Sequence, residues 1–113
     1  MKLSNNEAEQ LLKERLSRIE QVLNVKALEY VRNDDRMHNF NVGAKRKGVI
    51  RERIIEDFSL KHEISIEDML CDMEKGILPK EATVIEKFGD AINYLILKEM
   101  SILHKIKMEN GTN

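Results

Sequence analysis

The scarcity of helix-breaking residues constrains the fold of this chain more than any other feature of its sequence. The 113 residues include only 5 Gly and 1 Pro, whereas Leu, Ile, Glu and Lys are plentiful. No strand-like alternation of polar and apolar residues persists, and no internal repeat is visible. The sequence therefore predicts an all-α fold, a compact bundle of about four to five helices with long first and last helices, in a single domain spanning residues 1–113.

Local signals predict where the helices begin and end. Ser4 with Glu7 is a capping-box pattern, Asn33-Asp34-Asp35 indicates a break, and Gly48 and Gly76 are typical helix terminators. The expected helices run from Ser4 to the break, from Met37 to Lys47, from about 49 to 61, from Ser65 to Gly76, and from Pro79 to about Met108, before a frayed tail at about 110–113. Pro79 is expected in the first turn, where its missing N–H costs nothing.

Two apolar patterns concern packing. Leu12, Leu16, Ile19 and Leu23 follow a 4-3-4 spacing, which fits either the core of one subunit or a dimerisation face, and both interpretations stay open. In the last helix the pattern predicts one apolar side and one solvated side. The core side is expected to carry Phe88, Ile92, Leu95 and Leu103, and the solvated side Lys87, Ala91, Lys98 and Lys105.

Composition excludes several classes of function. The net charge is −1, aromatic residues make up 4% and Trp is absent, so phosphate neutralisation and base stacking are both poorly supported and we expect no general nucleic-acid binding. No apolar stretch approaches the length of a membrane span. The single cysteine, Cys71, cannot form an internal disulfide, which favours a cytoplasmic protein in which Cys71 is buried as a small apolar residue.

A stripe of polar residues marks the last helix. Glu86, Asp90 and Asn93 follow at i, i+4 and i+7 beside the predicted apolar side. Carboxylate and amide oxygens are ligands that Mg2+ prefers, so Glu86 and Asp90 are candidate metal ligands. The alternative is an acidic edge that bonds Lys or Arg of a neighbouring helix.

Two further polar groups are candidate ligand-binding residues. Arg36, His38 and Asn39 lie in a nine-residue segment rich in charged and amide side chains, where a guanidinium and an imidazole are suited to phosphate. Lys61 and His62 form the second group. For each group a structural alternative remains, namely a helix cap.

These blocks, in this order, resemble a family of small phage and prophage proteins. Over residues 27–98 they are similar to the group called nucleotide modification associated domain 1. The blocks that carry the resemblance are Ala27-Leu28-Glu29-Tyr30, Asp35-Arg36-Met37-His38-Asn39-Phe40, Lys61-His62 with Ser65 and Asp68, and Glu86-Lys87-Phe88-Gly89-Asp90-Ala91-Ile92-Asn93-Tyr94. The resemblance implies a phage context, host cytoplasm and a nucleotide-related role.

Glu86-Lys87-Phe88-Gly89-Asp90 also resembles, more distantly, a motif of MazG-like all-α nucleoside triphosphate pyrophosphatases. Those enzymes hold Mg2+ with acidic pairs on facing helices. Lys87 stands here where that family has a second acid, and no clear ExxE partner motif lies upstream. The departure favours a binder over a hydrolase.

The sequence therefore predicts a homo-oligomeric protein that binds a nucleotide or another small phosphorylated ligand, with or without Mg2+. Asn93 and Tyr94 join the candidate ligand-binding residues, because they follow Asp90 on the same helix. The alternatives are an anti-defence protein that sequesters a signalling nucleotide or blocks a host protein, and a MazG-like nucleotide pyrophosphohydrolase. A helical dimer with purely structural polar clusters is a further alternative.

Overall fold

The computed structural model describes residues 1–111, except for the side chain of Tyr30. Residues 112 and 113, predicted as part of the frayed tail, lie outside the described residues. The described residues form four α-helices and no strand, so the all-α prediction is confirmed. The helices are α1 (Asn5–Glu20), α2 (His38–Lys47), α3 (Arg51–Glu74) and α4 (Glu81–Glu109).

The chain divides into two compact units, residues 1–36 and 37–113, which are described separately. In the first unit α1 begins as predicted, because Ser4 Oγ accepts a hydrogen bond from the Glu7 N–H and Glu7 bonds back to the Ser4 N–H. A π-helical segment, Gln21–Val25, and a 3-10 segment, Lys26–Tyr30, continue from α1. Within α1 no residue is buried, so the Leu12 and Leu16 side chains remain exposed.

The predicted break at residues 33–35 is a tight turn. Asn33 and Asp34 have φ angles of 54° and 58°, a left-handed conformation that Asn and Asp tolerate better than most residues. The Asp35 N–H donates to the Arg32 carbonyl across the turn. The helix break was therefore read correctly from side-chain chemistry.

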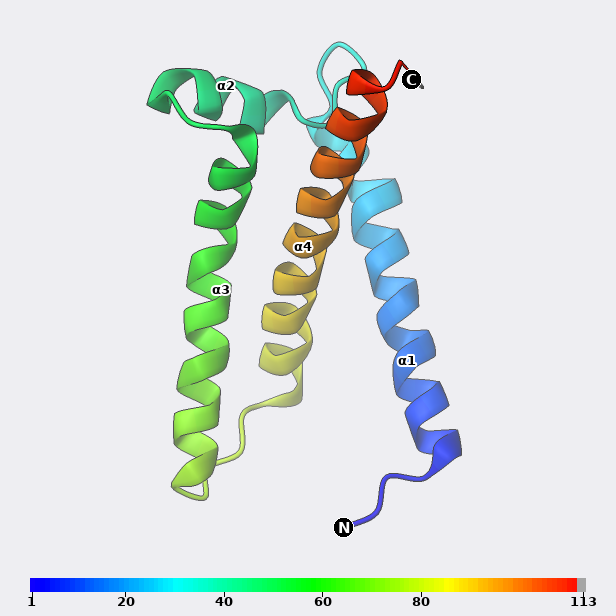
Figure 1. The fold of residues 1–113 in the computed structure, drawn as a ribbon. Helices are drawn as coiled ribbons and strands as arrows, with labels where there is room; N and C mark the ends of the chain where they lie inside the picture. Colours follow the sequence, from blue (N-terminus) through cyan, green and yellow to red (C-terminus); the bar gives the residue numbers. More distant parts are fainter. Residues whose placement is uncertain (112–113) are drawn as a thin grey trace. The chain divides into compact units, whose positions relative to one another are not determined.

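In the second unit, α3 and α4 run antiparallel side by side, and α2 lies across the beginning of α3 (Figure 1). The core at that end consists of Met37, Phe40, Ile54 and Ile55, with Tyr94 and Leu97 of α4 packed against it. α2 approaches α3 closely, since a Cβ built on Gly43 would lie 3.1 Å from Ile54 Cγ2. The two longest helices therefore share one core with a short third helix.

Two helix boundaries differ from the prediction. α3 is one helix of 24 residues rather than two short ones, because Ser65 does not cap a new helix but donates its Oγ–H back to the Lys61 carbonyl one turn earlier. α4 begins at Glu81, so Pro79 precedes the cap residue Lys80 and does not lie in the first turn. The expectation of short central helices is wrong for α3.

Gly76 does terminate α3 as predicted. Its φ is 84°, the Gly76 N–H donates to the Met73 carbonyl, and the Ile77 N–H donates to the Asp72 carbonyl. This pair of bonds is the Schellman arrangement, which satisfies the last carbonyls of a helix and requires a left-handed residue.

The predicted orientation of α4 is wrong. Its buried residues are Gly89, Asn93 and Ser101, whereas Phe88, Leu95 and Leu103 of the expected core side are 39–59% exposed. The described residues also contain no helix with the length and apolar character needed to cross a bilayer. Cys71, expected in the core, is exposed.

Candidate functional site

A series of aromatic rings connects the core to His62 on α3. The rings of Phe40 and Phe58 lie 5.5 Å apart edge to face, and Phe58 meets Tyr94 in the same manner at 6.3 Å. Tyr94 stacks on the imidazole of His62, with the centroids 5.8 Å apart and the planes 18° apart. Such contacts fix ring orientation, so three helices hold the His62 imidazole in one plane.

His62 faces Asp90 of α4. Its Nδ1 lies 3.5 Å from Asp90 Oδ2, and the His62 side chain is 8% exposed whereas that of Asp90 is 40% exposed. The contact is not a hydrogen bond, since Nδ1 of His62 is a buried atom without a hydrogen-bond partner among the described residues. In this pair, Asp90 is therefore accessible to solvent and His62 is buried.

Asn93, three residues after Asp90, carries the second buried polar atom without a hydrogen-bond partner among the described residues. Its side chain is buried on α4, and Oδ1 has no hydrogen-bond partner among the described residues. Leaving a buried polar atom unbonded costs about 1–3 kcal/mol. Native proteins keep few such atoms, and those that persist are explained by strain, function, water or ions.

Tyr94 completes what we call the His62 cluster, which consists of His62, Asp90, Asn93 and Tyr94. Burial raises the pKa of the Tyr94 phenol, and the nearby Asp90 carboxylate raises it further. The phenol therefore stays protonated at neutral pH and can donate a hydrogen bond. The His62 imidazole of α3 thus contacts one carboxylate and one phenol of α4, and the buried amide of Asn93 precedes that phenol in the chain.

The two predicted metal ligands, Glu86 and Asp90, each have a different neighbour, Lys87 and His62 respectively. Glu86 Oε1 lies 3.7 Å from Lys87 Nζ, and the Glu86 side chain is 66% exposed. The part of the chain that the structure describes holds no group of three or more His, Cys, Asp or Glu side chains that could bind a metal ion.

The remaining predicted ligand-binding residues belong to both units of the chain. Arg36 belongs to the first unit, where its guanidinium donates to the Leu23 carbonyl. His38 is half-buried in the first turn of α2 and Asn39 beside it is exposed. Lys61 is exposed on α3, next to His62 in the chain. Of the predicted residues, the structure brings His62 into contact with Asp90 and Tyr94.

A second polar cluster, which the sequence did not predict, consists of Arg51 and Glu52 of α3 and Ser101 and Lys105 of α4. We call it the Glu52 cluster. Ser101 Oγ donates to Glu52 Oε2, and Lys105 Nζ donates to Glu52 Oε1 at 2.6 Å. Arg51 Nε donates to Ser101 Oγ at 2.6 Å and lies 3.6 Å from Glu52 Oε2. Both carboxylate oxygens of this buried acid are therefore bonded.

Arg51 links the Glu52 cluster to neighbouring elements. Its other nitrogens donate to Asn41 Oδ1 of α2 at 3.3 Å and to the Ser101 carbonyl at 3.5 Å, and Nη2 lies 3.4 Å from His104 Nδ1. A planar guanidinium can bond several acceptors at once. The Glu52 cluster thereby connects α2, α3 and α4.

These bonds determine the acidity of Glu52. Burial alone would raise the pKa of this carboxyl, but the hydrogen bonds from Lys105 and Ser101 and the positive charge of Lys105 lower it, to about 2 from the ordinary 4.5. The acid is therefore ionised across the physiological range. Its charge is neutralised by Lys105 and Arg51 rather than by a proton.

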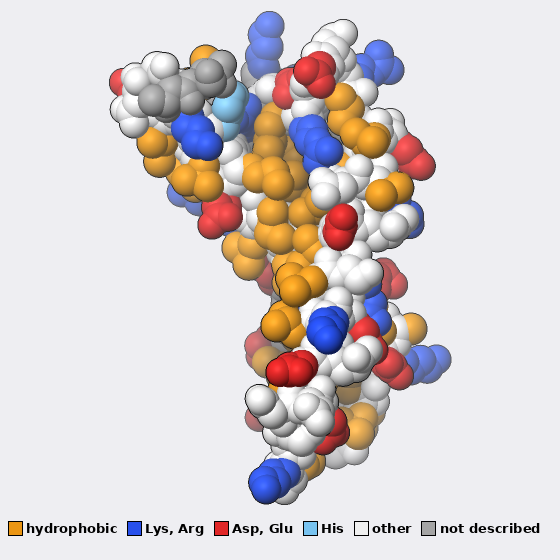
Figure 2. All heavy atoms as spheres, turned by 90° about the vertical axis from the view of Figure 1, so that its right-hand side faces the viewer, with side chains coloured by type: hydrophobic (Ala, Val, Ile, Leu, Met, Phe, Trp, Pro, Cys, Tyr) orange, Lys and Arg blue, Asp and Glu red, His pale blue; other side chains and the backbone are white. Residues whose placement is uncertain are grey.

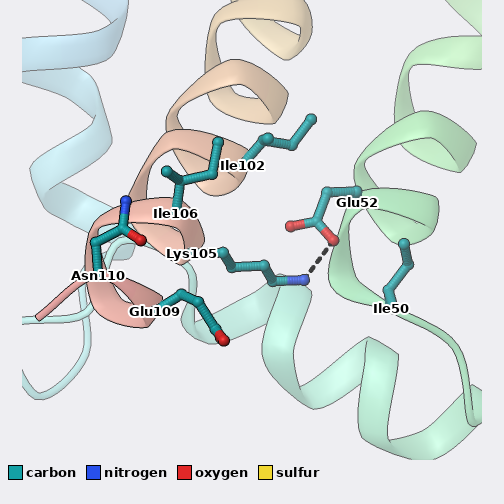
Figure 3. A pocket seen from close by; sticks show the side chains of 7 residues that line it. All are labelled: Ile50, Glu52, Ile102, Lys105, Ile106, Glu109 and Asn110. Carbon is teal, nitrogen blue, oxygen red and sulfur yellow. Dashed lines mark hydrogen bonds and ion pairs between the residues drawn. The ribbon is translucent and has the colours of Figure 1, made fainter.

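A surface pocket of about 570 Å³ adjoins the Glu52 cluster (Figure 3). It is lined by Ile50, Glu52, Ile102, Lys105, Ile106, Glu109 and Asn110. Figure 3 shows Glu52 and Lys105 pointing toward each other between α3 and α4. Most of the lining surface is apolar, and of its charged residues Glu52 and Lys105 are already paired with each other, whereas Glu109 adds a further carboxylate at the edge. No residue of the His62 cluster lines it.

Only a weak signal in the sequence could have located the Glu52 cluster. Ser101 and Lys105 are one turn apart on α4, and Ser101 interrupts an apolar stretch. Their partner Glu52 precedes Ser101 by 49 residues, so only the tertiary fold brings them together. Comparison with known proteins adds no further evidence, since no family model, curated protein or solved structure matches the chain.

Proposed function

We propose that the chain binds a nucleotide or another phosphorylated nucleoside derivative at the His62 cluster. The observation that carries this proposal is that two buried polar atoms have no hydrogen-bond partner among the described residues. They are Nδ1 of His62 on α3, which lies 3.5 Å from Asp90 Oδ2, and Oδ1 of Asn93 on α4, the helix that also carries Asp90. Each of these atoms carries the cost of a missing hydrogen bond, and a polar ligand that bonds to it would recover that free energy.

The side chains of the His62 cluster suit the sugar and base of such a ligand. Asp90 is an exposed acceptor for a ribose hydroxyl, and Asn93 Oδ1 accepts from a hydroxyl or a base amino group. Lys61 supplies a positive charge beside His62 in the sequence for phosphate. The resemblance to nucleotide modification associated domain 1 supports the same class of ligand.

Binding without hydrolysis is favoured over pyrophosphohydrolysis. Lys87 stands where the MazG-like motif has a second acid, and its Nζ lies 3.7 Å from Glu86 Oε1. An ammonium group beside the carboxylate competes with a divalent cation for it. In this form the protein would act by sequestering its ligand, as an anti-defence protein would sequester a signalling nucleotide.

Isothermal titration calorimetry on the full chain tests the proposal, using nucleoside mono-, di- and triphosphates and cyclic nucleotides with and without Mg2+. We expect at least one to bind, and Asn93→Leu and Asp90→Asn to weaken its binding at least tenfold. The control is Glu56→Gln, a half-exposed acid on α3 that pairs with Arg53 and Lys98 and is not part of the His62 cluster. Absence of heat with every nucleotide would contradict the proposal.

Chromatography of the same mixtures separates the alternatives. Release of pyrophosphate or a monophosphate product would establish a MazG-like hydrolase, and an unchanged bound nucleotide would establish a binder. If neither binding nor product is found, the protein acts through contact with another protein.

A further inference from the structure

Phe58 of α3 is half exposed although two other aromatic rings contact it. Its ring meets Phe40 of α2 and Tyr94 of α4 edge to face, with centroids 5.5 Å and 6.3 Å apart, yet 46% of Phe58 is exposed. All three rings belong to residues 37–113, so this unit alone leaves at least that fraction of Phe58 open. Exposed hydrophobic side chains are common in this chain (Figure 2), so the neighbours of Phe58 decide what its exposure means.

The neighbours of Phe58 belong to the His62 cluster. Phe58 precedes His62 by four residues on α3, and Tyr94 follows Asp90 by four residues on α4. Four residues span about 6 Å along a helix, so the contact of Phe58 with Tyr94 comes about one turn after that of His62 with Asp90. An exposed ring and an exposed carboxylate thus lie on either side of the stacked rings of Tyr94 and His62.

An aromatic ring in this position suits a nucleobase. Stacking on an aromatic side chain adds affinity for any base, because every base has a π face. The Tyr94 ring is less available for stacking, because His62 already lies against it. A low aromatic content argues against binding of a nucleic-acid strand, which needs a series of such rings, but one nucleotide needs only one.

We propose that Phe58 is the base platform of the ligand site, on which the nucleobase of a bound nucleotide stacks while its sugar reaches Asp90. This inference rests on the proposed function and extends it, because it makes the base, and not the sugar phosphate alone, part of what the site recognises. A purine has two fused rings and buries more apolar surface on Phe58 than a pyrimidine. We therefore expect AMP to bind more tightly than UMP.

Isothermal titration calorimetry of the full chain with AMP and with ribose 5-phosphate, which lacks the base, tests the proposal. We expect AMP to bind at least tenfold more tightly than ribose 5-phosphate, and Phe58→Leu to remove that difference. Phe88→Leu is the matched control, because Phe88 is 39% exposed but lies roughly 200° around α4 from Asp90. This control should keep the affinity for AMP.

The outcomes separate this inference from the proposed function. Equal affinity for AMP and ribose 5-phosphate, or an unchanged AMP affinity in Phe58→Leu, would overturn the base platform. If Asn93→Leu still weakened binding in that case, the proposed function would stand without the platform. A chain that binds no nucleotide would overturn both.

Fluorescence shows whether Phe58 is open in the full chain. The sequence contains no Trp, so Phe58→Trp places a single indole at the platform, and Phe88→Trp is its control. We expect acrylamide to quench the emission of both variants, and AMP to protect only the indole at position 58. An indole at position 58 that is shielded from acrylamide without AMP, as expected if another part of the chain covers it, would overturn the proposal. Circular dichroism verifies that each variant is helical.

Discussion

Two polar clusters lie between α3 and α4, and they differ in how completely their side chains are bonded. In the Glu52 cluster, both carboxylate oxygens accept hydrogen bonds and two cations neutralise the charge. In the His62 cluster, two buried atoms have no hydrogen-bond partner among the described residues. Breaking a fully paired buried charge is strongly destabilising, so we expect the Glu52 cluster to stabilise the fold, whereas the His62 cluster is the proposed ligand site.

This comparison predicts that Glu52→Ala has the largest effect on stability. The change leaves Arg51 and Ser101 without their acceptor at a buried position, and removing one partner of a buried pair is strongly destabilising. Because Lys105 is half exposed and can be hydrated, we expect a loss of about 3 kcal/mol. Urea denaturation measures it.

The control for that experiment is Glu56→Gln, which removes the partly exposed ion pairs of Glu56 with Arg53 and Lys98. Exposed pairs contribute about 0–1 kcal/mol. If both variants lose the same small amount of stability, the Glu52 cluster does not hold the helices together and the distinction between the clusters fails.

Acid should weaken the fold through the same residue. The pKa of Glu52 is about 2 in the folded chain and near 4.5 when the group is unperturbed. A lowered carboxyl pKa contributes stability that is complete above about pH 4.5 and is lost as the pH falls through about 2, because the unfolded chain then binds the proton first. The difference between the two pKa values corresponds to about 3 kcal/mol.

Stability curves of the wild type and Glu52→Gln between pH 6 and pH 2 isolate this contribution from those of other carboxyl groups. We expect the two curves to converge as the pH approaches 2. Parallel curves over the whole range would mean that the carboxylate is not held in its charged form by Lys105 and Ser101.

The two clusters also differ in what the sequence could predict. His62, Asp90 and Tyr94 lie within short polar blocks that interrupt apolar helices, and the structure brings His62 into contact with the other two. The residues of the Glu52 cluster have no distinguishing pattern in the local sequence of their helices. The hydrogen bonds of the cluster form only when the fold brings Glu52 next to Ser101, which lies 49 positions later in the chain.

The orientation of α4 could not be predicted for a related reason. Apolar residues occur around most of this helix, so periodicity alone does not select the packed side. The selection depends on which side can approach α3, and Gly89, Asn93 and Ser101 provide small or hydrogen-bonding groups there. Helix ends, by contrast, depend on local bonds, which is why the Ser4 cap and the Gly76 stop were predicted correctly.

Asn93→Leu should raise stability, the opposite sign from a change in the Glu52 cluster. Leu removes the buried Oδ1 that has no hydrogen-bond partner and adds apolar contact, so we expect a gain of about 1 kcal/mol. Ser101→Ala on the same side of α4 is the matched comparison, and it should lose about 2 kcal/mol because its hydroxyl bonds two charged groups. Thermal melts of both variants measure the difference, and equal losses would show that Asn93 is structural.

Asp90→Ala should have the smallest effect on stability. Asp90 is 40% exposed, and its 3.5 Å contact with His62 Nδ1 is not a hydrogen bond. A partly exposed pair of this kind is screened by solvent, so we expect a change of no more than about 0.5 kcal/mol in the free energy of unfolding. The same variant should lose nucleotide binding, because the carboxylate is the exposed acceptor of the His62 cluster. A loss of stability of about 2 kcal/mol or more would show instead that the contact between Asp90 and His62 holds α3 and α4 together, and the His62 cluster would then be structural like the Glu52 cluster.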